Sequence, residues 1–140
     1  MIRSFCNEDL FDVMKIWWES NLDAHSFISE NYWKSNFHIA EKLIKEAEIY
    51  VYENESGVVG FIGLNDNYIA GLFVKKCKRS QGIGRQLLNF VKSIKKDLIL
   101  TVYEKNMAAV RFYKREGFNI RELHMDEETQ EKEYVMFYQR

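Results

Sequence analysis

The apolar residues of this chain recur at two spacings, which divide it into amphipathic helices and short strands. Spacings of three and four predict four helices. The first follows Asn7, a residue suited to capping a helix, and the second runs without a break over about 29–47. The third follows the glycines at 82 and 84, and the fourth covers 107–116.

Alternation of apolar and polar residues predicts seven strands around these helices. They cover residues 2–5, 49–53, 58–64, 68–74, 98–103, 118–125 and 134–138. The turn at 54–57 folds the second strand back onto the third as a hairpin. The resulting order, β-α-α-β-β-β-α-β-α-β-β, predicts a mixed α/β (α+β) fold with a mostly antiparallel central sheet, in a single domain over residues 1–140.

The composition excludes several classes of protein. Of the 140 residues, 46% are hydrophobic and 29% are charged, which is typical of a globular domain rather than a disordered chain. No apolar run approaches the roughly 20 residues that span a membrane. The two cysteines, Cys6 and Cys77, do not make a disulfide framework, and neither belongs to a Cys-x-x-Cys pair. We therefore expect a soluble cytoplasmic domain, monomeric or homodimeric, with free thiols and no membrane partner.

The net charge of −1 conceals an uneven distribution of charge along the chain. Residues 67–96 hold eight cations and no carboxylate, so the rest of the chain holds 12 basic and 21 acidic residues, a balance of −9. A cationic block in an otherwise acidic protein predicts a local anionic ligand. Nucleic acid usually requires a wider basic face and is not expected as a partner. A solvated, lysine-rich helix face is the alternative explanation.

The most informative segment runs from Phe73 to Arg85, where a predicted strand leads through a glycine-bearing loop into a helix. Gly82 and Gly84 allow backbone N–H groups to turn toward a bulky anion, and the helix N-terminus adds unpaired donors and its dipole. The segment therefore predicts a phosphate or pyrophosphate site. Its spacing is not that of the nucleotide-hydrolase loop, Gly-x-x-x-x-Gly-Lys-Ser/Thr. It is also not that of the dinucleotide loop, Gly-x-Gly-x-x-Gly, because residue 87 is leucine. A plain structural turn is the alternative.

Two motifs of the chain resemble the signatures of the GNAT superfamily of acetyl-CoA-dependent N-acetyltransferases. The first, similar to the superfamily's pyrophosphate loop, is Arg79-x-x-Gly82-Ile83-Gly84. The second, similar to its Asn and Phe-Tyr segment, is Asn106 with Phe112-Tyr113-x-x-x-Gly117-Phe118. The resemblance covers nearly the whole chain and is strongest toward small bacterial YiaC-like acetyltransferases. It implies a GNAT-type fold, acetyl-CoA as the acetyl donor and no metal.

The resemblance also implies roles for particular residues. Backbone groups at Leu72, Phe73 and Val74 would pair with the pantetheine arm of the coenzyme, where strands 68–74 and 98–103 splay apart. The N–H of Phe73 or Val74 would also polarise the thioester carbonyl. The remaining coenzyme-binding residues would hold the pyrophosphate (Gln81, Gly82, Ile83 and Gly84), the outer phosphates (Lys78, Arg79 or Arg85) and the arm (Asn106).

Tyr113 is the residue that the resemblance implies for protonating the departing coenzyme thiolate. A phenol with a pKa of about 10 would give its proton to a thiol with a pKa of about 8.5, which is uphill by about 2 kcal/mol. The step is modest, so we expect loss of Tyr113 to slow turnover strongly without abolishing coenzyme binding. A core aromatic on a short helix is the alternative role.

The proton acceptor for the attacking amine has no single candidate. Many members of the superfamily carry a glutamate where this chain has Thr101, and threonine cannot act as a carboxylate base. His25, Glu30 and Tyr103 remain as candidates, and His25 is the one that we name as catalytic. A water relay to backbone carbonyls is the alternative.

Together these observations predict an N-acetyltransferase that moves the acetyl group of acetyl-CoA to a primary amine by direct attack in a ternary complex. The acidic remainder suits a cationic acceptor: a protein lysine, a protein N-terminus or a small-molecule amine. The family shapes its acceptor cleft with the helices around Phe27, Tyr32 and Trp33, although these aromatics would also suit the core. A non-catalytic acyl-CoA-binding sensor or regulatory module, and a nucleotide-binding protein, are the alternatives.

Overall fold

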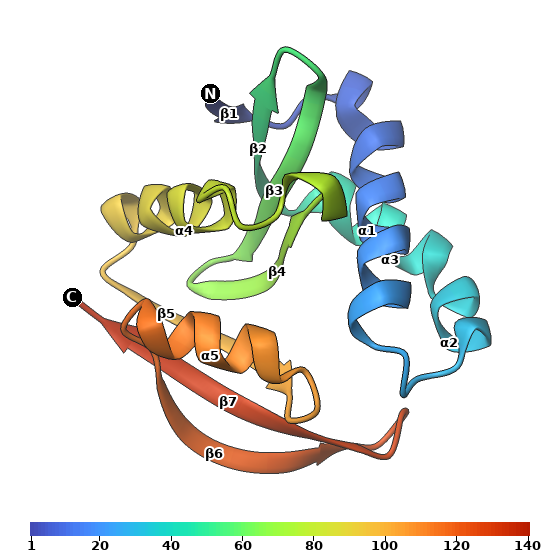
Figure 1. The fold of residues 1–140 in the computed structure, drawn as a ribbon, viewed down its shortest axis with the longest axis vertical. Helices are drawn as coiled ribbons and strands as arrows, with labels where there is room; N and C mark the ends of the chain where they lie inside the picture. The colour runs from blue at the N-terminus through green and yellow to red at the C-terminus, as the bar shows by residue number, and fades with distance from the viewer.

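The computed structural model describes all 140 residues, Met1–Arg140, and places every strand in one seven-stranded sheet of order β1-β2-β3-β4-β5-β7-β6 (Figure 1). The strands are β1 (Ile2–Ser4), β2 (Glu48–Asn54), β3 (Gly57–Asn65), β4 (Tyr68–Val74), β5 (Asp97–Tyr103), β6 (Asn119–Asp126) and β7 (Glu131–Gln139). The helices are α1 (Leu10–Ala24), α2 (Glu30–Ser35), α3 (Phe37–Glu46), α4 (Ile83–Ile94) and α5 (Met107–Arg115). None of these helices has the length and apolar composition needed to cross a membrane.

Helices cover both faces of the sheet, and each face has its own hydrophobic core. α4 and α5 pack over one face, where Leu87 and Phe118 belong to the larger buried cluster. α1 and α3 cover the other face, where Ile16 and Val51 belong to a second cluster. β3 lies between the two cores and is buried throughout from Val58 to Leu64, as a central strand with an almost unbroken apolar run requires.

The sheet opens between β4 and β5. Neighbouring strands elsewhere are antiparallel, whereas β4 and β5 are parallel and pair only at Tyr68 and Ile99. Beyond that pair the two strands diverge, as Figure 1 shows. A hydrogen bond of 2.9 Å between Tyr68 Oη and Thr101 Oγ1 bridges the strands near the start of the opening. The predicted mixed, mostly antiparallel sheet is confirmed, and one edge of β4 is left without a partner strand toward Val74.

The prediction of one continuous helix over 29–47 is wrong, because the chain forms two helices, α2 and α3, that meet at Asn36. The Asn36 side chain donates a hydrogen bond of 2.7 Å from Nδ2 to the backbone oxygen of Tyr32. An asparagine amide that bonds the backbone in this way competes with regular helix, which apolar spacing alone does not reveal. α2 contacts the loop between β6 and β7, where Tyr32 Oη donates to Glu128 at 3.1 Å.

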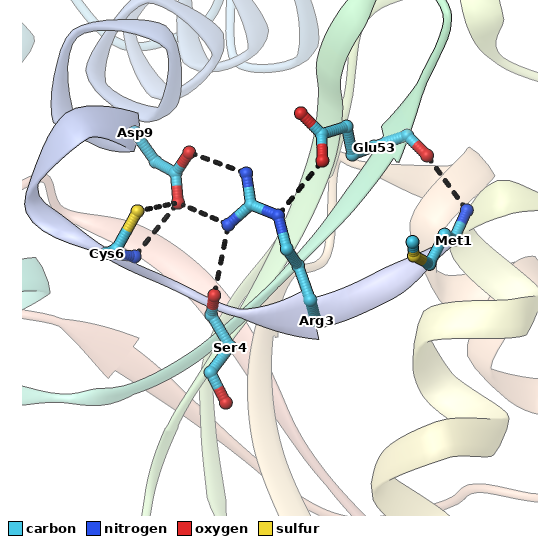
Figure 2. A network of polar contacts seen from close by, with 6 residues as sticks. All are labelled: Met1, Arg3, Ser4, Cys6, Asp9 and Glu53. Atoms are coloured by element: carbon cyan, nitrogen blue, oxygen red, sulfur yellow. Dashed lines mark hydrogen bonds and ion pairs between the residues drawn. The ribbon is translucent and has the colours of Figure 1, made fainter.

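A polar network fixes the N-terminal strand (Figure 2). Arg3 forms a bidentate ion pair with Asp9 at 2.8 and 2.9 Å and a further contact of 3.0 Å with Glu53 of β2. Asp9 also accepts the backbone N–H of Cys6 at 2.9 Å, just before the chain turns into α1. The guanidinium lowers the pKa of the Asp9 carboxyl to about 2, so the pair is ionised at neutral pH. The network stabilises the β1 edge of the sheet, away from the opening between β4 and β5.

Candidate active site

Two cavities lie where β4 and β5 diverge. The larger has a volume of about 890 Å³ and includes the glycine loop before α4. The smaller has a volume of about 240 Å³ and includes side chains of α1, α2 and β7. The cavities share one wall, which is formed by Leu72, Phe73, Asn106, Ala109 and Tyr113. Two ligands, one in each cavity, would therefore meet at this shared wall.

Eleven of the twelve residues predicted to bind the coenzyme line the larger cavity. They are Leu72, Phe73, Val74, Lys78, Arg79, Gly82, Ile83, Gly84, Arg85, Asn106 and Tyr113. The exception is Gln81, which is exposed in the loop and forms no part of the wall. The structure thus brings together residues from β4, the loop and α5, and their role in binding the coenzyme stays a prediction.

The loop before α4 presents backbone donors to the larger cavity. Ser80 and Gly82 both adopt left-handed backbone conformations, with φ of +64° and +80°. The first hydrogen bond of α4 runs from the N–H of Gln86 to the oxygen of Gly82 at 3.0 Å. The N–H groups of residues 83–85 precede this bond and have no acceptor within the chain. These donors and the helix dipole favour an anion such as a diphosphate.

Gly84 keeps space open beside these donors. A Cβ at this position would meet Phe112 at 3.7 Å and Val74 at 3.8 Å, which are ordinary van der Waals distances. The packing of the chain therefore does not require glycine here. A bulky ligand that approaches the backbone N–H groups does favour it, because any side chain would occupy the same space. The loop therefore fits a diphosphate.

The larger cavity is cationic. Its wall carries six cations and two carboxylates, a balance of +4: Lys78, Arg79, Arg85, Lys105, Arg111 and Arg115 against Asp23 and Glu116. This potential suits a polyanionic ligand. Arg111 and Arg115 were not predicted from the sequence, because they lie outside the cationic block at 67–96. Their spacing of four residues, which places them on one face of α5, was the available signal.

One carboxylate ties α1 to the loop before α4. Asp23 accepts hydrogen bonds from Arg79 Nη1 at 2.7 Å and from Lys76 Nζ at 3.2 Å, and these two cations lower its pKa. Arg79 also donates from Nε to the backbone oxygen of Val74 at 3.1 Å. The side chain of Arg79, which was predicted to lie near the outer phosphates, is therefore held between the end of α1 and the end of β4.

The free edge of β4 offers backbone N–H groups to the cavities. Lys75 donates its N–H to the oxygen of Val59 in β3 at 2.8 Å, and N–H directions alternate along a strand. The N–H of Phe73 therefore points toward β3, and those of Leu72 and Val74 point into the opening. Of the two residues predicted to polarise a thioester carbonyl, Val74 is the one whose N–H lies on the cavity side.

Tyr113 lies in the shared wall. α5 holds it edge-on against Phe112 and Phe118, with ring centroids 5.2 and 5.5 Å away. The residue is only 8% exposed. Desolvation raises the pKa of its hydroxyl well above the usual value of about 10, and no hydrogen bond contributes to the shift. The phenol is therefore protonated at neutral pH and free to donate to a ligand.

A chain of hydrogen bonds runs from α1 to α5 along the smaller cavity. Asn21 Nδ2 donates to the backbone oxygen of Trp17 at 2.9 Å, which leaves Oδ1 to accept from His25 Nδ1 at 3.1 Å. His25 Nε2 then accepts from Asn106 Nδ2 at 3.3 Å, and Asn106 Oδ1 accepts the N–H of Ala109. These bonds assign the proton of His25 to Nδ1. Burial lowers the pKa of His25 to about 4, so it is neutral at pH 7.

Aromatic side chains form much of the smaller cavity. Trp17, Trp33 and Tyr103 line it together with His25. His25 stacks on Trp33 with ring centroids 5.5 Å apart and an angle of 26° between the ring planes. Tyr103 lies edge-on to His25 at 5.1 Å. Such a wall suits the aliphatic part of a ligand.

Other residues that the sequence suggested for the acceptor side lie outside this cavity. Phe27 packs edge-on against Tyr103 at 5.7 Å, and Tyr32 reaches the loop between β6 and β7. Glu30 is exposed and belongs to neither wall. Of the three predicted proton acceptors, only His25 and Tyr103 line the smaller cavity.

Glu133 is the one carboxylate on the wall of the smaller cavity, and it was not among the residues predicted from the sequence. It lies on β7 directly opposite Tyr103 of β5. Alternation along β7 indicates which residues lie on the same face of the sheet as Glu133, but not which strand lies beside β7. The sequence therefore held no signal that would place this carboxylate at the opening.

Comparison with known proteins gives a family match and similar full-length relatives. Residues 45–120 match the family described as the acetyltransferase (GNAT) domain. Over 138 residues the chain is 30% identical to the peptidyl-lysine N-acetyltransferase YiaC of Escherichia coli strain K12, and the match covers 97% of this chain and 94% of that protein.

Solved structures share the fold over nearly the whole chain. The solution structure of apo-form YjaB from Escherichia coli superposes with a TM-score of 0.87 at 29% identity, and the match covers 99% of this chain and 96% of that one. The PaiA N-acetyltransferase of Thermoplasma acidophilum, crystallised with coenzyme A, gives a TM-score of 0.84 at 22% identity, with 100% and 98% covered.

Proposed function

The chain belongs to the GNAT family of acetyltransferases, and from this premise we propose that it acetylates the side-chain amine of lysine in a peptide or protein. It is an N-acetyltransferase, and acetyl-CoA is the donor. The proposal concerns the acceptor and the residues that carry out the transfer. A protein N-terminus and a small-molecule amine are the other acceptors that the sequence suggested.

One observation carries this proposal: a cationic cavity and an aromatic cavity meet at a wall that contains Tyr113. The larger cavity, with the unpaired N–H groups of 83–85, suits the diphosphate of acetyl-CoA. The smaller cavity suits an ammonium on an aliphatic chain, since it combines aromatic walls with the carboxylate of Glu133. The thioester and the amine then approach each other at Tyr113, which permits direct attack in a ternary complex.

On the donor side, we assign the coenzyme to the residues that line the larger cavity. Residues 83–85 hold the diphosphate through backbone N–H groups, and Lys78, Arg79 and Arg85 supply cationic side chains. The Val74 N–H donates to the carbonyl oxygen of the thioester and stabilises the negative charge that develops there during attack.

Tyr113 protonates the thiolate as the bond between carbon and sulfur breaks. Burial keeps its phenol protonated until that moment. The same desolvated surroundings raise the pKa of a thiolate formed beside it, so the proton transfer does not become steeply uphill. Phenylalanine would preserve the packing of this side chain but could not donate the proton.

The lysine acceptor is supported by shape, charge and similarity. A cavity of about 240 Å³ with aromatic walls fits an unbranched chain that ends in an ammonium. The chain outside residues 67–96 carries a charge of −9, which attracts cationic peptides. The relative YiaC is named a peptidyl-lysine N-acetyltransferase.

The test measures thiol release from acetyl-CoA with three acceptors: an N-terminally blocked peptide that contains lysine, the same peptide with arginine instead, and a polyamine. We expect turnover with the lysine peptide and none with the arginine peptide. Turnover with the polyamine alone would overturn the peptide assignment. Tight coenzyme binding in calorimetry without turnover on any amine would instead support a non-catalytic acyl-CoA-binding module.

The remaining expectations from the sequence stay predictions. They are a cytoplasmic location, a monomeric or homodimeric state, and the lack of nucleic-acid and membrane partners. Light scattering of the purified protein tests the oligomeric state, and fractionation of cells tests the location.

A further inference from the structure

Four titratable side chains line the smaller cavity: His25, Tyr103, Tyr113 and Glu133. An amine that binds there as an ammonium must lose a proton before its lone pair can attack a thioester. One of these groups, directly or through a water, is therefore the natural place for that proton to go.

Three of the four groups are poorly suited to accept a proton. The Nε2 lone pair of His25 already accepts a hydrogen bond from Asn106, and burial makes this imidazole a weak base. Tyr103 Oη donates to Asp126 at 2.8 Å, and burial keeps it protonated. Tyr113 is likewise a protonated phenol, and it serves as the acid for the leaving thiolate.

Glu133 has the geometry of a base. Its side chain is 16% exposed, and the pairing of β5 with β7 places it on the same face of the sheet as Thr101 and Tyr103. Its Oε1 accepts from His124 Nε2 of β6 at 3.0 Å. This contact orients the carboxylate through one oxygen and leaves Oε2 for an ammonium or a bridging water.

We propose that Glu133 is the general base of the transfer, an inference that rests on the proposed function. The acceptor ammonium gives one proton to the Glu133 carboxylate: an N–H bond breaks and an O–H bond forms. The neutral amine attacks the acetyl carbon, a C–N bond forms, and the C–S bond breaks with its electron pair going to sulfur. Tyr113 gives its proton to that sulfur and regains one from the nitrogen of the adduct. Glu133 finally releases its proton to solvent.

The decisive variant is Glu133→Gln, which keeps the size of the side chain and an oxygen for His124 but cannot accept the proton. With saturating acetyl-CoA and the lysine peptide at pH 7.5, we expect kcat to fall by about 10²-fold to 10³-fold. The Kd of coenzyme A should not change, because Glu133 does not line the larger cavity.

Glu131→Gln is the matched control. Glu131 lies two residues earlier on the same face of β7, is 18% exposed and pairs with Lys105 at 2.9 Å, but it lines neither cavity. We expect its kcat to equal that of the wild type.

A pH profile separates a base from a merely structural carboxylate. Between pH 7 and 10 a growing share of the peptide lysine is already neutral, so Glu133→Gln should approach wild-type activity as the pH rises. The titratable groups that face Glu133 are His124 on β6 and Tyr103 on β5. Glu133 raises the pKa of His124 through their hydrogen bond, so in Glu133→Gln the pKa of this histidine moves back toward its ordinary value of about 6.5, below the pH range compared. Wild-type kcat in Glu133→Gln, or a loss that is equal at every pH, would overturn the assignment. Lack of turnover by the wild type itself would instead overturn the proposed function.

Discussion

The two cavities share a wall at Tyr113 but differ in how they are built. The larger cavity offers backbone N–H groups from one short segment, residues 83–85, surrounded by cations with a net charge of +4. The smaller cavity offers side chains from α1, α2, β4, β5, α5 and β7, with Glu133 as its only carboxylate. The anion donors of the larger cavity are therefore made by local backbone geometry, although its wall also includes α1, β4 and α5, whereas the polar groups of the smaller cavity come from side chains of distant elements.

This difference indicates which property each substitution should change. Backbone donors persist when side chains change, so the larger cavity should lose affinity only when its space or charge is altered. The smaller cavity depends on single side chains, so its variants should affect the acceptor and the chemical step. In the shared wall, a change that removes only the hydroxyl of Tyr113 should affect kcat, since this group acts where bonds change.

The largest effect is expected at the shared wall. Tyr113→Phe should lower kcat by about 10³-fold, or about 4 kcal/mol, because the thiolate then leaves without a proton donor. Steady-state kinetics measure the loss, and calorimetry should show an unchanged Kd for coenzyme A. Tyr138→Phe, a tyrosine outside both cavities that packs on Phe118, is the control. An unchanged kcat in Tyr113→Phe would show that the wall only separates the two ligands.

The next effect isolates the larger cavity. Gly84→Asp should raise the Kd of coenzyme A about 100-fold, or about 2.7 kcal/mol, since it places a carboxylate beside the donors of the diphosphate. Gly84→Ala is the control, because its Cβ meets Phe112 and Val74 at ordinary distances and should leave folding intact. Calorimetry compares the two variants. A Kd of Gly84→Asp equal to that of the wild type would mean that the diphosphate binds elsewhere.

The way each cavity is built also explains how much of the site could be predicted from the sequence. The pyrophosphate loop is contiguous, so its glycines, the flanking strand and the following helix are visible as a pattern. Val74 could be named as a candidate for the same reason, but only the pairing of β4 with β3 shows that its N–H, and not that of Phe73, faces the opening.

Two failures had different physical origins. Asn36 breaks a helix through a hydrogen bond from its own side chain to Tyr32, which outweighs a favourable apolar spacing. Glu133 could not be found, because its place depends on the register between β5 and β7, which joins residues far apart in the chain. Spacing predicts what one segment does and says little about which segments become neighbours.

A pH experiment isolates one side chain of the smaller cavity. Burial lowers the pKa of His25 from 6.5 to about 4, so between these values the unfolded chain binds a proton that the folded chain excludes. The contribution of His25 to stability is therefore complete above pH 6.5 and is lost as the pH falls toward 4. When the pH falls from 7.5 to 4.5, protonation of His25 in the unfolded chain should lower the free energy of unfolding by about 2 kcal/mol.

Urea unfolding of the wild type and of His25→Gln at both pH values tests this expectation. The difference in pH dependence between the two proteins reports His25 alone, because the other ionisable groups titrate in both. His38→Gln, at an exposed histidine outside both cavities, is the control. If the wild type and His25→Gln lose stability in parallel, then the imidazole is not held neutral by the cavity wall.

The smallest effect concerns Asp23, one of the two carboxylates on the wall of the cationic cavity. In Asp23→Asn, Arg79 Nη1 and Lys76 Nζ lose their ionic partner, while Arg79 keeps its bond to the oxygen of Val74. We expect the Kd of coenzyme A to fall about threefold, because exposed ion pairs contribute less than about 1 kcal/mol and the lost negative charge no longer opposes the phosphates.

Asp12→Asn removes the same charge from the other end of α1 and should leave the Kd unchanged. At 0.5 M NaCl screening should abolish the gain. A weaker Kd in Asp23→Asn would show instead that Asp23 positions Arg79 for the phosphates, so that even the larger cavity depends on one side chain from a distant helix.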